Sequence, residues 1–238
     1  NLQTRAVLDG DFYVLNGQKV WTSMAHVAEM GFFLVRTDPT LAKHKGITFL
    51  LVDMKTPGIS IRPLRQITGE AEFNEVFLDN VRVPATNVVG KVNEGWGVAI
   101  TTLAYERDVL TMIRHISLRT ALERLIALAK RTKRNGHVAA AEPVIRQKLA
   151  ALMVAERCLQ LNGYRSLTKI LQGGAPGPEG STSKLFWSQV DQDLAEVATE
   201  VIGPYSQITA GSPWAPDEGQ WEFYCCLARG SGIRAGTS

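Results

Sequence analysis

The chain has 238 residues, of which 45% are hydrophobic, and a formal net charge of +3. This length and composition predict a globular chain with a substantial core, organised as one large domain or two ordinary ones. The small and dispersed positive charge argues against nucleic acid or a membrane surface as a partner. No apolar run of the sequence reaches the roughly 20 residues of a membrane-spanning helix.

Residues 1 to about 88 have the pattern of β structure. The segment FYVLNGQKVWTS contains two β-rich runs around Asn16 and Gly17, a pair that favours a two-residue type I′ hairpin. Further β-rich runs follow, separated by turn-forming residues, at 31–38, 46–54, 59–64 and 74–84. Five or more strands without an intervening helix predict an antiparallel sandwich or a small barrel.

From about residue 93 the hydrophobic pattern becomes helical. Pro143 suits a first helical turn, and Gly203-Pro204 is typical of a helix end. The predicted fold class is α+β multidomain, with an antiparallel β-barrel or sandwich domain over residues 1–90 and a C-terminal helical bundle over residues 91–238. The helices are expected from near Trp96 to Thr132, from Pro143 to about Gln172, from Ser183 to about Ile202 and from Gln220 to Leu227.

Glu106 stands in a run, LAYERDVL, that otherwise has the pattern of an inward helical stripe. Its neighbours on a helical wheel are nearly all apolar: Ala99, Thr102, Leu103, Val109, Leu110 and Ile113. A charged helix residue is usually solvated or paired, and Arg107 and Asp108 beside it leave the register open by one position. If Glu106 does lie on the stripe, desolvation raises its pKa towards neutrality, the range that suits a general base.

Two further motifs each have a structural and a functional interpretation. Trp21 in the WTS motif at 21–23 is either a half-buried packing residue or a flat wall, with two adjacent hydroxyl donors, for a planar cofactor ring. The basic segment RTKRNG at 131–136 is either a solvated helix end or a site for a phosphate-rich ligand. The histidines and cysteines lack metal-binding spacing, so no metal site is expected, and the three cysteines fit a reducing compartment.

The order of these motifs resembles the acyl-CoA dehydrogenase family. The matching segments are VLNGQKVWTSMAHVAEMGFFLVRTDP, KGITFLLVDMKTPGISIRPLRQITGEAEFNEVFLDNVRVPATNVVGKVNEGWGVA, YERD and GIRAGTS. Members begin with a helical domain and a flavin-contacting Glu-Pro-x-x-Gly-Ser-Asp segment, neither of which precedes LQTRA here. The resemblance therefore implies that the chain holds the β-domain and most of the C-terminal helical domain.

The resemblance also implies roles for individual residues. Trp21 corresponds to the position that lies against the isoalloxazine of FAD, and the hydroxyls of Thr22 and Ser23 to the groups that hydrogen-bond its N5 and O4 edge. Arg107 corresponds to a position that contacts the acyl-CoA. Either Arg131 or Arg134 corresponds to an arginine that binds the FAD pyrophosphate of a neighbouring subunit. Thr237 is likewise expected to bind FAD.

The catalytic base departs from the commonest family pattern. Many members carry the catalytic Glu immediately before Gly-Thr near the C-terminus, where this chain has Ala235. The isovaleryl- and long-chain-type members instead use a Glu that precedes Arg on the first helix of the bundle, and Glu106 matches that position. A second departure is Pro204, because the family usually has Gly-Gly at Gly203-Pro204 in a loop that helps to seat FAD across a subunit interface.

By resemblance, the expected activity is α,β-dehydrogenation of an acyl-CoA to trans-2-enoyl-CoA, as in fatty acid β-oxidation, with FAD as cofactor and Glu106 as base. The implied electron acceptor is an electron-transferring flavoprotein. The implied assembly is a homotetramer or a heterotetramer, in the cytoplasm or in the mitochondrial matrix of a eukaryote. Two alternatives stay open: a non-catalytic partner subunit of a heteromeric dehydrogenase, suggested by Ala235 and Pro204, and a flavin oxidase or monooxygenase on the same scaffold.

Overall fold

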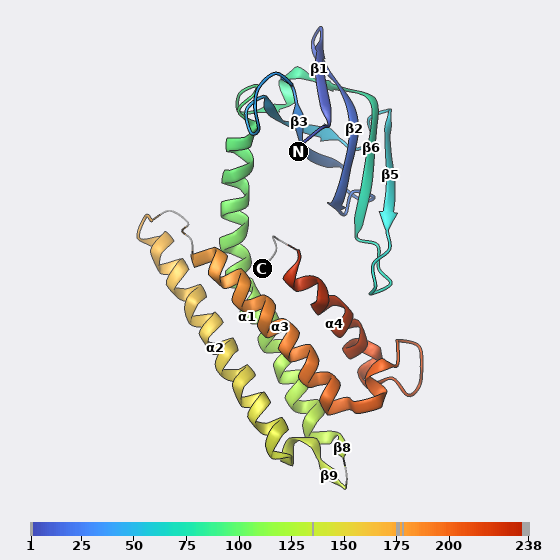
Figure 1. Ribbon diagram of the computed structural model, residues 1–238, viewed down its shortest axis with the longest axis vertical. Helices are drawn as coiled ribbons and strands as arrows, with labels where there is room; N and C mark the ends of the chain where they lie inside the picture. The colour runs from blue at the N-terminus through green and yellow to red at the C-terminus, as the bar shows by residue number, and fades with distance from the viewer. Residues whose placement is uncertain (1, 135, 175–176, 178, 235–238) are drawn as a thin grey trace. The chain divides into compact units, whose positions relative to one another are not determined.

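The computed structural model describes residues 2–134, 136–174, 177 and 179–234, except for the side chains of residues 107–112 and 179–181. The contacts within the chain divide it into two compact units, Asn1–Leu103 and Ala104–Ser238. Strands make up most of the first unit and helices most of the second (Figure 1).

The first unit is built on one seven-stranded, mostly antiparallel sheet. The strands are ordered β5-β6-β2-β1-β3-β4-β7, and the pairing of β1 with β3 is parallel. The predicted antiparallel β class is therefore confirmed for this part of the chain. The strands are β1 (Arg5–Asp9), β2 (Phe12–Ser23), β3 (Met30–Arg36), β4 (Ile47–Asp53), β5 (Ile59–Leu64), β6 (Phe73–Pro84) and β7 (Val88–Val89).

The core of the sheet follows from alternation along its strands. In β6 the buried residues occupy every second position, first from Asn74 to Leu78 and then, after a change of phase, at Val81 and Val83. Successive side chains of a strand point to opposite faces, so one face of β6 packs inward. Residues from β2, β3 and β4 complete this core, among them Leu15, Val35, Leu50 and Val52.

The predicted hairpin at Asn16 and Gly17 is wrong. The turn between β1 and β2 lies earlier, at Gly10 and Asp11, where Asp9 pairs with Phe12. Gly10 has a φ of 61°, the left-handed conformation that a tight two-residue hairpin requires. β2 then continues through Asn16 and Gly17 without turning back.

The Asn16-Gly17 pair instead forms an irregularity inside β2. The pairing with β6 changes register between Leu15 and Gly17. Gly17 has a φ of 143°, and a Cβ at this position would lie 2.9 Å from the Cα of Thr4. The side-chain oxygen of Asn16 accepts a hydrogen bond of 2.9 Å from the backbone N–H of Asn80 on β6. The same residues that favour a turn thus form a bulge held by long-range contacts.

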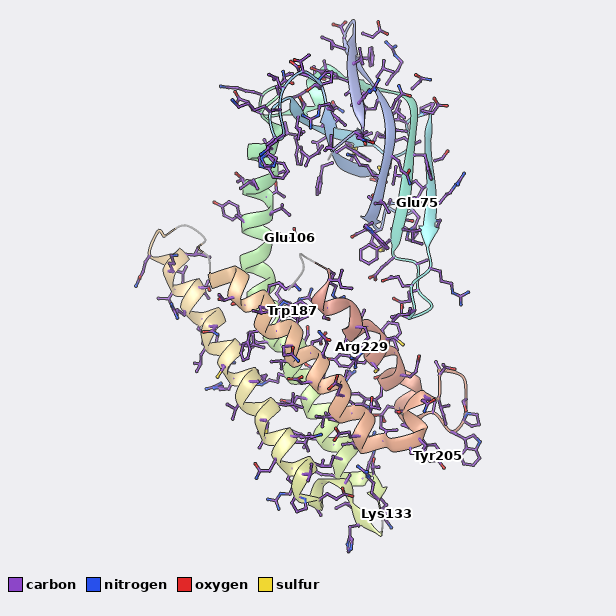
Figure 2. All side chains as sticks on the ribbon, in the orientation of Figure 1. Glu75, Glu106, Lys133, Trp187, Tyr205 and Arg229 are labelled. Carbon is purple, nitrogen blue, oxygen red and sulfur yellow. The ribbon has the colours of Figure 1, made fainter. Side chains whose placement is uncertain are left out.

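In its described residues the second unit consists mainly of four helices, and the predicted helices are confirmed with shifts of a few residues at their ends. The first helix, which contains Glu106 (labelled in Figure 2), runs across the division between the two units. A short hairpin of β8 (Lys133–Arg134) and β9 (His137–Val138) follows it. The helices are α1 (Gly95–Arg131), α2 (Pro143–Leu171), α3 (Glu179–Ile202) and α4 (Gln220–Arg229).

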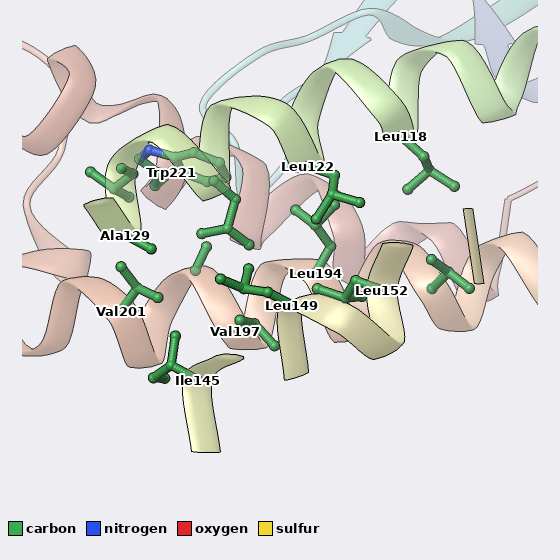
Figure 3. Packing of buried hydrophobic residues seen from close by; sticks show 14 of the residues in the cluster. Leu118, Leu122, Ala129, Ile145, Leu149, Leu152, Leu194, Val197, Val201 and Trp221 are labelled. Carbon is green, nitrogen blue, oxygen red and sulfur yellow. The ribbon is translucent and has the colours of Figure 1, made fainter. Parts of the chain in front are cut away.

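Buried aliphatic side chains hold the helical unit together. Figure 3 shows them gathered between α1, α2 and α3, with Trp221 of α4 beside them. Burying one such side chain stabilises the fold by about 1.5–3 kcal/mol, so this cluster fixes how the helices pack. Its members include Leu118, Leu122, Leu125, Leu149, Leu152, Leu194, Val197 and Val201.

Candidate active site

The WTS motif lies at the end of β2, on an irregular stretch of backbone. Trp21 has a φ of 58°, a left-handed conformation that costs a non-glycine residue about 1–2 kcal/mol. The pairing of β2 with β6 is interrupted between Lys19 and Thr22, so the strand is bulged at this tryptophan. This bulge turns the Trp21 ring outward, and 64% of its surface is exposed.

The Trp21 ring fits a site for a planar ligand. Its aromatic contact is an edge-on one with Phe73, at 6.1 Å between ring centroids and an interplanar angle of 84°. The exposed surface is therefore free to stack on another flat ring. Thr22 is half-buried and Ser23 is exposed. The three residues thus fit the predicted isoalloxazine-binding group, and the simple packing interpretation of Trp21 does not explain its exposure.

A buried asparagine of β6 holds this segment through hydrogen bonds to its backbone. Asn74 is fully buried and donates from Nδ2 to the carbonyl oxygens of Thr22, at 2.9 Å, and Glu72, at 3.2 Å. Its Oδ1 lies 3.2 Å from Nδ1 of His26. Sequence reasoning missed Asn74, although a signal was present, because it is a polar residue at an inward position of an alternating strand.

Glu106 is exposed in this chain, so the predicted burial of its carboxylate is not found here. On the apolar stripe around it, Ala99 is buried, whereas Leu103 is 47% and Ile113 is 50% exposed. The side chains of Val109 and Leu110, which share the predicted stripe, lie outside the described residues. The catalytic role of Glu106 therefore stays a prediction.

Three other sequence positions cannot be placed. The side chain of Arg107, predicted to contact acyl-CoA, lies outside the described residues, as do Ala235 and Thr237. Their proposed roles therefore stay predictions.

Both candidate arginines of the basic segment have partners inside the helical unit. Arg131 forms an ion pair with Asp217, whose other carboxylate oxygen accepts a 2.7 Å hydrogen bond from Nε1 of Trp221. Arg134 donates from Nη1 to the carbonyl oxygen of Glu200 at 2.7 Å, and its Nε lies 3.8 Å from a carboxylate oxygen of Glu142. To bind a pyrophosphate, either guanidinium has to share or leave these partners.

The loop at Gly203-Pro204 forms a short 3₁₀ helix, η3 (Gly203–Gln207), with Pro204 in its first turn. Gly203 has a φ of 67°, so this glycine ends α3 in the left-handed conformation. Pro204 lacks a backbone N–H and therefore removes one donor that a glycine here would offer to a ligand.

Metal and membrane sites are not indicated in the part of the chain that the structure describes. No group of three or more His, Cys, Asp or Glu side chains among these residues is placed to bind a metal ion. The three cysteines are all unpaired thiols. None of the described helices combines the length and the apolar character that crossing a membrane requires.

Two family models match the chain. The acyl-CoA dehydrogenase middle domain matches residues 1–81, and the acyl-CoA dehydrogenase C-terminal domain matches residues 93–238. Together they cover nearly the whole sequence. The boundary between the two matches falls close to the change from strands to helices.

Two curated relatives come from Mycobacterium tuberculosis. Acyl-CoA dehydrogenase IpdE1 is 43% identical over 206 residues, which is 85% of this chain and 51% of the relative. Acyl-CoA dehydrogenase FadE34 is 44% identical over 201 residues, which is 84% of this chain and 27% of the relative. The chain thus spans about half, or less, of the length of these relatives.

Two solved structures are also similar to the chain over nearly its whole length. The Tcur3481-Tcur3483 steroid ACAD superposes with a TM-score of 0.90 and 28% identity, over 99% of this chain and 60% of that one. The ChsE4-ChsE5 complex from Mycobacterium tuberculosis gives a TM-score of 0.87 and 30% identity, over 100% of this chain and 61% of that one. From the matching family models and the identity to the curated relatives, the chain belongs to the acyl-CoA dehydrogenase family.

Proposed function

We propose that the chain forms the flavin-facing and helical parts of an FAD-dependent acyl-CoA dehydrogenase subunit that converts an acyl-CoA thioester to a trans-2-enoyl-CoA. The observation that carries this proposal is the strained, exposed Trp21 followed by two hydroxyl residues, in a chain of this family. A strained backbone that displays an aromatic ring to solvent has no evident use in folding, and such strain is typical of binding sites.

The cofactor-binding residues of this proposal are Trp21, Thr22 and Ser23 for the isoalloxazine, with Arg131 or Arg134 and Thr237 for the remainder of FAD. Bound FAD supplies a hydride acceptor. Trp21 orients the flat ring system by stacking, and the hydroxyls of Thr22 and Ser23 donate hydrogen bonds to its polar edge. Asn74 keeps the three residues in place through its hydrogen bond to the Thr22 carbonyl.

Glu106 is the proposed base, and its carboxylate takes up the α-proton of the thioester. A solvated carboxylate is too weak for this task, so the substrate and the rest of the protein have to cover Glu106 and remove water from it. The uncovered stripe of Leu103 and Ile113 on the same helix supports this, because an apolar surface beside an acid is suited to burial by a partner or an acyl chain. Arg107, next in sequence, is proposed to bind the acyl-CoA.

An electron-transferring flavoprotein is proposed as the electron acceptor, and a tetramer as the assembly. The named structural relatives, Tcur3481-Tcur3483 and ChsE4-ChsE5, each combine two different chains. By analogy with them, we favour an assembly with a second, different subunit.

The test uses the full-length protein, purified with its natural partner if it has one. We expect Glu106→Gln to abolish acyl-CoA-dependent bleaching of the flavin absorbance while the yellow cofactor stays bound. Glu123→Gln is the matched control, because Glu123 is an exposed acid on the same helix, and it is expected to leave bleaching unchanged. Normal bleaching by Glu106→Gln would contradict the assignment of the base.

A second candidate function is a non-catalytic partner subunit in a heteromeric dehydrogenase. Two observations favour it, namely Ala235 at the commonest base position and Pro204 in a loop that, by family resemblance, seats FAD. This candidate predicts protein that is poor in FAD and gains activity only when mixed with another chain, with activity that does not depend on Glu106. The FAD content of the purified protein, and its activity with and without another chain, therefore distinguish the two functions.

A further inference from the structure

The sheet loses one of its strands beside the segment that leads to the WTS motif. β1 lies between β2 and β3 and starts at Arg5, which pairs with Asn16 of β2 and with Arg36 of β3. The part of β2 that follows Asn16 therefore extends past the start of β1. On one side this part pairs with β6, and on the other side it has no strand partner among the described residues.

A groove of about 1570 Å³ borders this part of β2. Its walls include Gly17–Val20 of β2, the chain at Thr4 and Arg5, and Arg36 of β3. Oγ1 of Thr4 donates to the carbonyl oxygen of Gln18 at 3.0 Å, and the carbonyl oxygen of Thr4 accepts a 2.7 Å hydrogen bond from the backbone N–H of Arg36. Beyond Thr4, a contact between β2 and β3 has to cross the groove.

The side chain of Lys19 makes such a contact. Its Nζ donates to the carbonyl oxygen of Leu34 on β3 at 2.5 Å. Lys19 is half-buried, and it lies opposite Val76 of β6, which is fully buried. Directly opposed residues of two strands point to the same face of a sheet, so the Lys19 side chain leaves β2 on its inner face. The hydrogen bond therefore joins β2 to β3 where no strand lies between them.

Lys19 is also the last residue of β2 that pairs with β6 before the bulge at Trp21. The register of that pairing breaks between Lys19 and Thr22, and Trp21 between them has a left-handed backbone. A strained conformation of this kind persists only where the surrounding structure holds it. Asn74 holds the segment after Trp21 through the Thr22 carbonyl, and Lys19 holds the segment before it.

We infer that Lys19 is a positioning residue for the flavin-binding group, because its hydrogen bond to β3 fixes the direction in which β2 enters the bulge and hence the plane of the Trp21 ring. This inference rests on the proposed function and deepens it, since it assigns part of the affinity for FAD to a residue that acts through Trp21. The donor is an ammonium group, and a charge-assisted hydrogen bond is about twice as strong as a neutral one. The hold on β2 therefore weakens when Lys19 loses its proton.

The protonation of Lys19 changes in an accessible pH range. Burial lowers the pKa of Lys19 to about 8, compared with about 10.4 for a lysine in an unfolded chain. Between these values the folded protein binds fewer protons at Lys19 than the unfolded chain, so this residue's contribution to the free energy of unfolding rises with pH. A loss of FAD affinity above pH 8 therefore cannot result from lower stability at Lys19. The other charged residues that line the groove are Arg5 of β1, Arg36 of β3, Lys43 of the loop before β4 and Asp79 of β6.

The test measures FAD binding to full-length apoprotein, with its natural partner chain if it has one, from the quenching of flavin fluorescence. Lys19→Met keeps most of the length of the side chain and removes the donor. We expect the Kd for FAD at pH 7 to rise about tenfold, the effect of losing one charge-assisted hydrogen bond. Lys91→Met, at an exposed lysine of the same unit, is the matched control and leaves the Kd unchanged. An unchanged Kd in Lys19→Met overturns the positioning role while the proposed function stands. Wild-type protein that binds no FAD overturns the proposed function and this inference with it.

The pH profile and amide hydrogen exchange separate positioning from damage to the fold. The wild-type Kd is expected to rise between pH 7 and 9, with a midpoint near the pKa of Lys19, and Lys19→Met is expected to lack this step. Exchange in Lys19→Met should become faster at Trp21–Ser23 and stay unchanged in β4. A wild-type profile without the step, a step of equal size in Lys19→Met, or faster exchange throughout the sheet unit overturns the inference.

Discussion

The two units of the chain differ in how they satisfy buried polar groups. In the β-sheet unit, the buried amide of Asn74 hydrogen-bonds two backbone carbonyls and lies within hydrogen-bond distance of the His26 ring. In the helical unit, buried nitrogen or oxygen atoms of Arg114, His115, Glu156 and Arg234 have no hydrogen-bond partner among the residues that the structure describes. Such atoms require water, a ligand or another chain. Among the described residues, the sheet unit thus satisfies the buried amide of Asn74 internally, whereas the helical unit leaves several buried polar atoms without an internal partner.

The largest expected effect is the loss of stability on replacing Asn74, because this residue satisfies buried backbone groups within the sheet unit. Asn74→Ala removes the donor for the carbonyl oxygens of Thr22 and Glu72 and leaves a cavity in the sheet core. We expect a loss of about 3 kcal/mol in the free energy of unfolding, because buried acceptors are left unsatisfied. Urea unfolding measures this change. Asn87→Ala, which removes one hydrogen bond to the Leu51 carbonyl at a half-exposed position, is the control and should cost about 1 kcal/mol or less. Equal losses would show that Asn74 has no special role.

Periodicity was sufficient to predict most elements of both units. Helix α2 begins at Pro143, as its position in the pattern predicts, and β5 occupies the predicted residues 59–64. The Asn16-Gly17 hairpin was wrong because a local pair that favours a turn also suits a bulge. Contacts with Thr4 and Asn80 favour the bulge over the turn, and both residues are distant in sequence and adjacent only in the fold.

The candidate site was predictable to a different extent in each unit. WTS could be recognised as a motif, but the strain at Trp21 and the supporting Asn74 depend on the pairing of β2 with β6, which no local pattern contains. For Glu106, the helical wheel gave the apolar stripe, but a wheel cannot say what covers it. Leu103 and Ile113 are exposed together with Glu106.

A smaller effect is expected at Trp21, which tests whether the sheet displays this ring for binding. Trp21→Gly relieves the left-handed strain at φ 58° but loses the contact with Phe73, so stability should change by less than about 1 kcal/mol. FAD retention in the full-length protein should fall at least about tenfold if stacking contributes about 1.4 kcal/mol. Met24→Gly is the matched control, since Met24 also has a positive φ of 55°, and it should leave FAD bound. A loss of stability well above 2 kcal/mol would show instead that Trp21 is a packing residue.

The smallest change in the free energy of unfolding is expected at Glu156 in the helical unit. Its sign is opposite to that of the change at Asn74. The Oε1 atom of Glu156 is buried without a hydrogen bond from any described residue, and Nε of Arg119 lies 3.7 Å away. Because the Arg119 side chain is 47% exposed, water can solvate its charge when the acid is removed. Glu156→Leu should therefore leave the free energy of unfolding unchanged or raise it by up to about 1 kcal/mol. Thermal unfolding measures this, with the exposed Glu123→Leu as control.

The same substitution also reveals whether the helical unit has a partner at this point. If a second chain or a bound ligand supplies the missing donor to Glu156, Glu156→Leu leaves that donor buried and unpaired in the complex. Stability should then fall by about 1–3 kcal/mol in the assembled protein but not in the separated subunit. A loss in the separated subunit as large as that of Asn74→Ala would mean that the helical unit satisfies Glu156 internally, and the contrast between the two units would fail.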